Sequence, residues 1–149
     1  FDLGAALWAI PATRMKMKTE HLVPLSQQAL EIIGELRETC RGSRYLFPGR
    51  NRDRPISNNT VLFALYRLGY KSRMTGHGFR AVASTMLNEA GFRADVVERQ
   101  LAHCERNEVR SAYNRAEYLA ERKAMMQWWG QHLADLTSGA KVMPFQRVA

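Results

Sequence analysis

The chain of 149 residues is 46% hydrophobic, which is enough for one domain-sized core. Its 22 Lys and Arg residues exceed its 14 Asp and Glu residues, so the formal net charge is +8. That charge favours a polyanionic partner, although a basic surface that is merely solvated has the same composition. No apolar run is long enough to span a membrane and none has the form of a secretory signal, so we expect no membrane partner.

The first predicted element is a β-hairpin. Its strand candidates are the short apolar runs Leu7–Ile10 and His21–Leu25. The segment between them carries Arg14, Lys16 and Lys18, which places positive charge on a turn that can reach DNA. An exposed, solvated hairpin tip is the alternative interpretation.

A helix and a basic loop follow. Ser26 is a typical helix N-cap, and the spacing predicts a helix to about Cys40. Its expected buried stripe consists of Leu30, Ile33 and Leu36. The polar loop 49–55 then carries three arginines, Arg50, Arg52 and Arg54. These side chains are candidates for phosphate contacts, but most loops of this kind are simply solvated.

Ser57 is predicted to open the next helix, which ends near Gly69. The polar and basic face of this helix includes Asn58, Asn59 and Arg67. Two interpretations stay open, because such a face either lies in a DNA groove or forms an ordinary helix surface.

The central predicted helix spans Gly76–Ala90, and Gly91 is its natural stop. Its core-facing residues recur at three-four spacing and are Phe79, Val82, Ala83, Met86, Leu87 and Ala90. His77 and Arg80 lie three residues apart at the start of this helix, with Arg80 at the rim of the buried stripe. The two side chains are therefore expected near each other.

Three more helices are predicted, at Ala94–Leu101, Asn107–Asn114 and from Arg115 to about Leu136. The last is amphipathic, with Tyr118, Met125, Met126, Trp129 and Leu133 on one face. The fold class is thus mainly α with a small antiparallel β-hairpin (α+β). Residues 1–137 are expected to form the folded domain, and residues 138–149 a loose tail.

His77, Arg80, His103 and Tyr113 together suit an attack on a phosphodiester. A guanidinium holds two non-bridging oxygens through paired hydrogen bonds, and imidazoles donate to the same oxygens or move protons near neutral pH. A tyrosine phenol is a known covalent nucleophile, but its pKa of about 10 requires basic or cationic neighbours. Each residue alone is more often structural, so the prediction depends on the combination.

Metal chemistry and disulfides are not expected. Cys40 and Cys104 fit neither a disulfide framework nor a zinc spacing, and both are predicted to be reduced. The four histidines are scattered without close ligand pairs. The sequence therefore predicts no metal and no cofactor.

Three segments carry a resemblance to a known family. They are Thr75-Gly76-His77-Gly78-Phe79-Arg80, then Gln100-Leu101-Ala102-His103, then Ala112-Tyr113-Asn114-Arg115. They resemble the catalytic segment of tyrosine recombinases, specifically integrases of phage and genomic-island type. The hairpin is similar too, since the family's lysine corresponds to Lys16 by its spacing from Val23-Pro24-Leu25.

The resemblance implies roles for these residues. Tyr113 becomes the nucleophile and Lys16 the general acid, while Arg80, His77 and His103 bind or protonate the scissile phosphate. The implied activity is site-specific recombination through a 3′-phosphotyrosyl intermediate. The implied partners are double-stranded attachment sites and other protomers, in a tetramer on DNA within the bacterial cytoplasm, associated with the nucleoid. Trp128 or Trp129 is a candidate anchor between protomers.

The sequence also departs from the family pattern. The family's first arginine precedes the hairpin, and no such segment is present, so the chain is expected to be an N-terminally truncated and inactive piece of a longer enzyme. Nine residues separate His103 from Tyr113, a spacing that the resemblance associates with island-type integrases. The alternative function is a noncatalytic helical DNA-binding module or integrase remnant.

Overall fold

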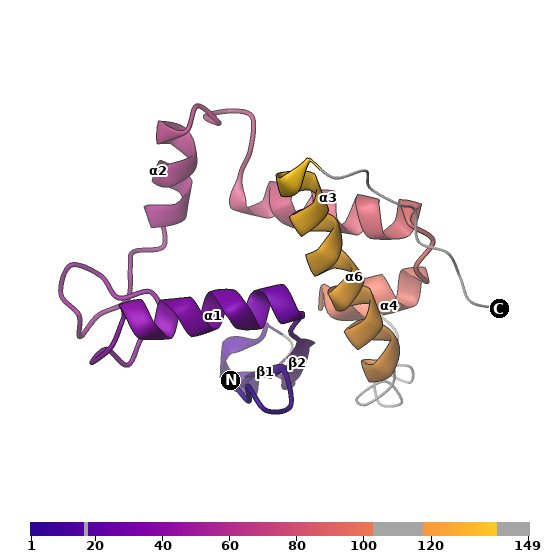
Figure 1. Ribbon diagram of the computed structural model, residues 1–149, viewed down its shortest axis with the longest axis horizontal. Helices are drawn as coiled ribbons and strands as arrows, with labels where there is room; N and C mark the ends of the chain where they lie inside the picture. The colour runs from indigo at the N-terminus through magenta and orange to yellow at the C-terminus, as the bar shows by residue number, and fades with distance from the viewer. Residues whose placement is uncertain (17, 103–117, 140–149) are drawn as a thin grey trace. The chain divides into compact units, whose positions relative to one another are not determined.

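The computed structural model describes residues 1–16, 18–102 and 118–139 (Figure 1). The chain divides into two compact units. The first unit contains residues 1–30 and 84–149, and the second contains residues 31–83. Among the described helices, none is both long and apolar enough to cross a membrane. The mainly α class with one small antiparallel sheet is confirmed.

The hairpin belongs to the first unit. β1 (Leu7–Ile10) pairs with β2 (His21–Pro24), and the ladder is antiparallel. The second strand ends one residue before the predicted Leu25, because the chain then turns into a helix. Leu25 still donates its N–H to the Ala6 carbonyl at 2.9 Å, which continues the pairing for one more step.

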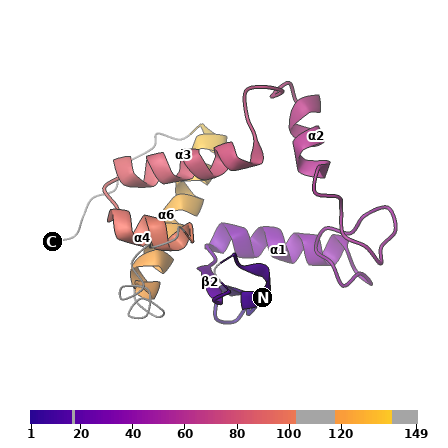
Figure 2. The same ribbon diagram turned by 180° about the vertical axis from the view of Figure 1, so that it is seen from behind.

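The core of the first unit lies where three helices meet. α4 (Ala94–Gln100) packs against α6 (Leu119–Ser138), and both views show the two helices adjacent (Figures 1 and 2). The fully buried apolar residues of this core are Leu87, Val96, Val97 and Met125. The short helix packed through Val97 is therefore confirmed, one residue shorter at its end than predicted.

The long C-terminal helix starts later than predicted. Tyr118 has a left-handed backbone (φ 67°) and precedes α6, so it is the N-cap and not part of the helical face. The helix continues to Ser138, two residues beyond the prediction, and ends at Gly139 with φ 70°. The predicted helix at 107–114 lies outside the described residues, and the division at residue 138 stays a prediction.

α1 (Gln27–Thr39) begins with the predicted cap. The Ser26 hydroxyl oxygen accepts a hydrogen bond from the Ala29 N–H at 3.2 Å. The start of the helix is fastened to α6, because the Gln27 N–H donates to Gln127 Oε1 at 2.9 Å. Of the predicted stripe, Ile33 is buried, whereas Leu30 and Leu36 are half-buried.

α2 (Thr60–Arg67), in the second unit, begins three residues later than predicted. Ser57 instead starts a turn, in which its carbonyl accepts from the Thr60 N–H at 3.0 Å. Asn58 and Asn59 consequently precede the helix and do not lie on its face, which corrects the prediction. The stop near Gly69, which has φ 84°, is confirmed.

α3 (Gly76–Glu89) forms where predicted, one residue shorter at its end, and is followed by Gly91 at φ 87°. Its buried stripe is shorter than predicted. Leu87 is buried, but Phe79 is 50% exposed and Val82 is 41% exposed. The physical reason is that the core around Leu87 contacts only the C-terminal part of the helix.

Candidate active site

The N-terminus of α3 is built by the residues around Thr75. Thr75 Oγ1 accepts a hydrogen bond from the Gly78 N–H at 3.1 Å, which caps the helix. A Cβ atom on Gly78 would lie 2.7 Å from the Met74 sulfur, so only glycine fits without moving that side chain. The presence of Thr75 and Gly78 at these positions is thus explained by local structure.

His77 and Arg80 are both placed in the first turns of α3. The His77 side chain is exposed, and Arg80 is half-buried. Three residues apart on a helix, they occupy neighbouring positions. The N-terminus of this 14-residue helix carries partial positive charge and unsatisfied N–H groups. An imidazole, a guanidinium and a helix N-terminus together form a suitable environment for a phosphate.

Lys16 lies in the connection between the two strands. The connection starts with a short 3-10 turn at Ala12–Arg14, and Arg14, Lys16 and Lys18 are all exposed. Lys18 has a left-handed backbone with φ 51°. Because neither strand extends to these residues, Lys16 and Lys18 are not alternate positions of one strand.

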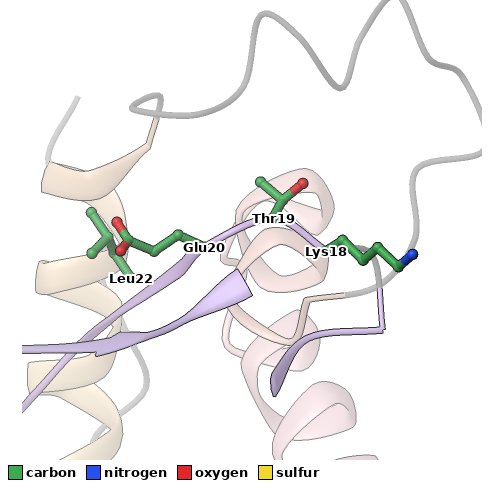
Figure 3. A pocket seen from close by; sticks show the side chains of 4 residues that line it. All are labelled: Lys18, Thr19, Glu20 and Leu22. Atoms are coloured by element: carbon green, nitrogen blue, oxygen red, sulfur yellow. The ribbon is translucent and has the colours of Figure 1, made fainter. Parts of the chain in front are cut away.

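A surface pocket of about 320 Å³ adjoins the end of this connection. It is lined by Lys18, Thr19, Glu20 and Leu22 (Figure 3). The Lys18 ammonium group extends away from the Glu20 carboxylate. Lys18 is also exposed, so its ammonium group is accessible to an external anion.

The base of the hairpin is held by three buried polar side chains. His21, Gln100 and Arg122 are 6%, 9% and 4% exposed. His21 Nε2 lies 3.1 Å from the Gln100 carbonyl oxygen, and Arg122 Nε donates to Gln100 Oε1 at 2.8 Å. Arg122 Nη2 also donates to the carbonyl oxygen of Leu22. Burial, together with the charge of Arg99, lowers the pKa of Arg122 to about 10.

These three residues are not among the predicted site residues, although the sequence contains one signal for them. Arg122 falls four residues after Tyr118 and three before Met125, which places a charged residue on an otherwise apolar stripe. A charge at such a position requires buried acceptors. His21 and Gln100 gave no comparable signal.

His103 and Tyr113 lie outside the described residues, so their predicted roles stay predictions. Tyr118, in contrast, is described. The Arg93 guanidinium lies 4.8 Å from the centre of its ring. A hydrogen bond to Asp95 and burial raise the pKa of Tyr118, against the opposing effect of Arg93. The Tyr118 phenol is thus engaged by two neighbouring charged side chains, Asp95 and Arg93.

The arginine loop forms a closed turn. The Gly49 N–H donates to the Arg54 carbonyl at 2.7 Å, and Arg52 Nη2 donates to the Arg41 carbonyl at 2.7 Å. Arg50, Arg52 and Arg54 are all exposed, but Arg52 has this structural role in addition. Arg67, at the end of α2, is also exposed.

The tryptophans proposed as anchors between protomers pack within the first unit. The Trp128 and Phe92 rings meet edge to face, with centroids 5.3 Å apart, and Trp129 is packed partly buried against the same core. Cys40 is a free thiol, and Cys104 lies outside the described residues. No group of three or more potential metal ligands occurs within 1–16, 18–102 and 118–139.

Comparison with known proteins identifies the family. The sequence model of the phage integrase family matches residues 1–119. The prophage integrase IntA of Escherichia coli K12 is 46% identical over 95% of this chain, and the integrase of Enterobacteria phage P4 is 44% identical over 89%. The prophage integrase IntZ of Escherichia coli K12 is 42% identical over 93%.

These alignments cover 35%, 34% and 34% of the three relatives, so the chain spans about a third of their length. No solved structure was found to match it. The resemblance drawn from the segments around Arg80, His103 and Tyr113 is nevertheless confirmed by a match over most of the chain: the chain belongs to the phage integrase family.

Proposed function

We propose that this chain is part of the catalytic region of a tyrosine-type integrase, which inserts and excises a phage or genomic island by cleaving and rejoining DNA. The observation that carries the proposal is the capped N-terminus of α3, which presents His77 and Arg80 together in a protein of this family. The integrases of phage P4 and of the Escherichia coli prophages support it by their similarity.

The proposed reaction is a transesterification. The Tyr113 phenolate oxygen attacks the scissile phosphorus, a 3′-phosphotyrosyl bond forms, and the bond from phosphorus to the 5′ oxygen breaks. Lys16 gives a proton to the departing 5′ oxygen. Arg80, His77 and His103 stabilise the charge on the non-bridging oxygens. A 5′ hydroxyl then reverses the process on the new strand, so the bond energy is conserved and the chemistry consumes no ATP.

The proposed partner is the double-stranded attachment site. Contacts to DNA are assigned to Arg14, Lys18, Arg50, Arg52, Arg54, Asn58, Asn59 and Arg67. Exposure supports this assignment for all of them. Further protomers are required for two strand exchanges, and we propose a tetramer on DNA in the bacterial cytoplasm at the nucleoid.

The test is covalent trapping. In the complete integrase on a nicked half-site, Tyr113→Phe should bind DNA but form no covalent adduct, because only the attacking oxygen is removed. Tyr118→Phe is the matched control and should retain the adduct, because the Tyr118 phenol is hydrogen-bonded to Asp95 and lies against Arg93. Reversible binding without an adduct in the unmodified integrase would favour the alternative, a noncatalytic DNA-binding module. An adduct that persists in the Tyr113 variant contradicts the assignment of the nucleophile.

A further inference from the structure

β2, the strand that follows Lys16, pairs with β1 along one of its two edges. In an antiparallel ladder, successive residues of a strand alternate between facing the partner strand and facing outward. Leu25 donates to Ala6, so Leu25 and Val23 face β1, whereas Pro24 and Leu22 face away from it. The Leu22 carbonyl is thus on the outer edge of β2.

Arg122 occupies that outer edge. Its Nη2 donates to the Leu22 carbonyl, where a neighbouring strand would otherwise supply an N–H. Its Nε donates to Gln100 Oε1 at the end of α4. His21, next to Leu22, adds a second link to α4 through the Gln100 carbonyl. One guanidinium therefore joins β2, α4 and α6 within the first unit.

The chemistry of this contact points to a role beyond stability. Within the described part of the chain, the acceptors of Arg122 are an amide and a backbone carbonyl, which carry no charge. Burying a cation among neutral acceptors costs free energy, and an apolar residue of similar size would be neutral or better for folding. A guanidinium offers what an apolar residue lacks, namely fixed donors in two directions.

We propose that Arg122 and Gln100 are positioning residues, which hold the outer edge of β2 against α4 and α6 and thereby set where Lys16 delivers its proton. Lys16 lies six residues before Leu22, on the connection that leads into β2. The inference rests on the proposed function of Lys16 as general acid. It assigns to Arg122 no contact with DNA.

The first test measures the hairpin directly. Arg122→Met keeps the side-chain length and removes both donated hydrogen bonds. In the complete integrase, amide exchange of residues 7–10 and 21–23 should accelerate by about tenfold or more, while exchange in α2 stays unchanged. Arg93→Met is the matched control, because within the described residues Arg93 pairs with Asp95 and with Glu121 of α6, at 3.2 Å, and not with β2. Unchanged hairpin exchange, or equal acceleration in α2, overturns the proposal.

The second test separates positioning of the acid from other losses. On ordinary DNA, Arg122→Met should cleave about tenfold more slowly. On DNA with sulfur in place of the 5′ bridging oxygen, the leaving thiolate needs no proton, so the rate should return to that of the unmodified integrase. Arg93→Met should cleave both substrates normally. An Arg122→Met variant that remains slow on the sulfur substrate overturns the proposal.

Measuring Lys16→Ala on the same two substrates separates the role of Lys16 as general acid from the positioning role of Arg122. If Lys16→Ala is rescued by sulfur and Arg122→Met is not, positioning by Arg122 is wrong and the proposed function stands. If Lys16→Ala is not rescued, Lys16 is not the acid, and the proposed role of Lys16 and the positioning of its proton fail together. The exchange measurement then still decides whether Arg122 holds the hairpin.

Discussion

Gly130 of α6 lies so close to Ser26 that a Cβ atom on residue 130 would stand 2.5 Å from the Ser26 hydroxyl oxygen. The same atom would be 2.8 Å from Ser26 Cβ, which has no freedom to rotate away. Residues at the start of α1 also donate to α6, as Gln28 Nε2 does to Gln131 Oε1 at 3.1 Å. The close approach of these two segments therefore depends on the missing side chain.

Gly130→Ala should lower the free energy of unfolding by about 1–3 kcal/mol, because the added methyl group overpacks the contact with Ser26. Denaturant titration of the 149-residue chain measures this. Gly34→Ala is the control, since no atom lies within 4 Å of its added Cβ in the middle of α1. That substitution should raise stability by about 0.5–1 kcal/mol. Equal effects of the two substitutions would contradict the packing argument.

Gln100→Leu should destabilise the chain more than Arg122→Met does. Removing the amide leaves a buried guanidinium with one acceptor fewer, at a cost of about 1–3 kcal/mol. The pKa of Arg122 is lowered to about 10, so its buried charge opposes folding at every pH below that value, and the penalty is relieved only as pH rises through it. Arg122→Met should consequently change stability by less than about 1 kcal/mol.

The double variant completes the thermodynamic cycle. Adding Arg122→Met to Gln100→Leu should restore most of the lost stability, because the unpaired charge is then gone. Thermal or denaturant unfolding of the four proteins at neutral pH gives the coupling energy. Simple addition of the two single effects would show that the side chains do not act together.

Lys16→Ala in the complete integrase should slow cleavage of ordinary DNA strongly. On the sulfur-bridged substrate, the cleavage rate of this variant should return to that of the unmodified integrase. Arg80→Ala should be slow on both substrates, because the charge it stabilises sits on non-bridging oxygens that sulfur leaves unchanged. Single-turnover cleavage rates measure both. Lys18→Ala is the matched control on the same connection. If the sulfur-bridged substrate rescues Lys18→Ala but not Lys16→Ala, the general acid is Lys18.

Arg50→Gln should weaken binding of duplex DNA by the 149-residue chain and reduce the salt dependence of its affinity by about one ion. Circular dichroism should show no loss of folding, because the closed turn is formed by backbone groups and by Arg52. Arg37→Gln removes an equal charge from the exposed surface of α1 and should leave the salt dependence unchanged. If the affinities of the two variants depend on salt to the same extent, the loop 49–55 is not part of the DNA-binding surface.

The sequence was sufficient to predict the elements whose signals are local. The Ser26 cap, the Gly91 stop and the two strands follow from short patterns, and the structure confirms them. The predicted start of α2 was wrong, because Ser57 and the two asparagines that follow it fit a helix cap and a turn equally well. The exposure of Phe79 could not be predicted, since periodicity identifies an apolar face but not what covers it.

The candidate site was predictable only as a set of residues. A family pattern points to Lys16, His77 and Arg80 as candidates, and the structure adds the Thr75 cap, the exposure of Lys16 and His77 and the half-buried position of Arg80. Arg122 was missed because its partners are 22 and 100 residues away in sequence. Such pairs become visible only when the segments are folded together.

Pro24 and Arg122 together limit how the small sheet can associate with other chains. Both act on the outer side of β2, where Pro24 has no N–H to donate and the Leu22 carbonyl is already occupied by Arg122. A strand from another molecule needs alternating free donors and acceptors along the edge it joins. Strand addition along this edge of β2 is therefore blocked, and on β1 the N–H and carbonyl of Leu7 are likewise already paired with Asp2.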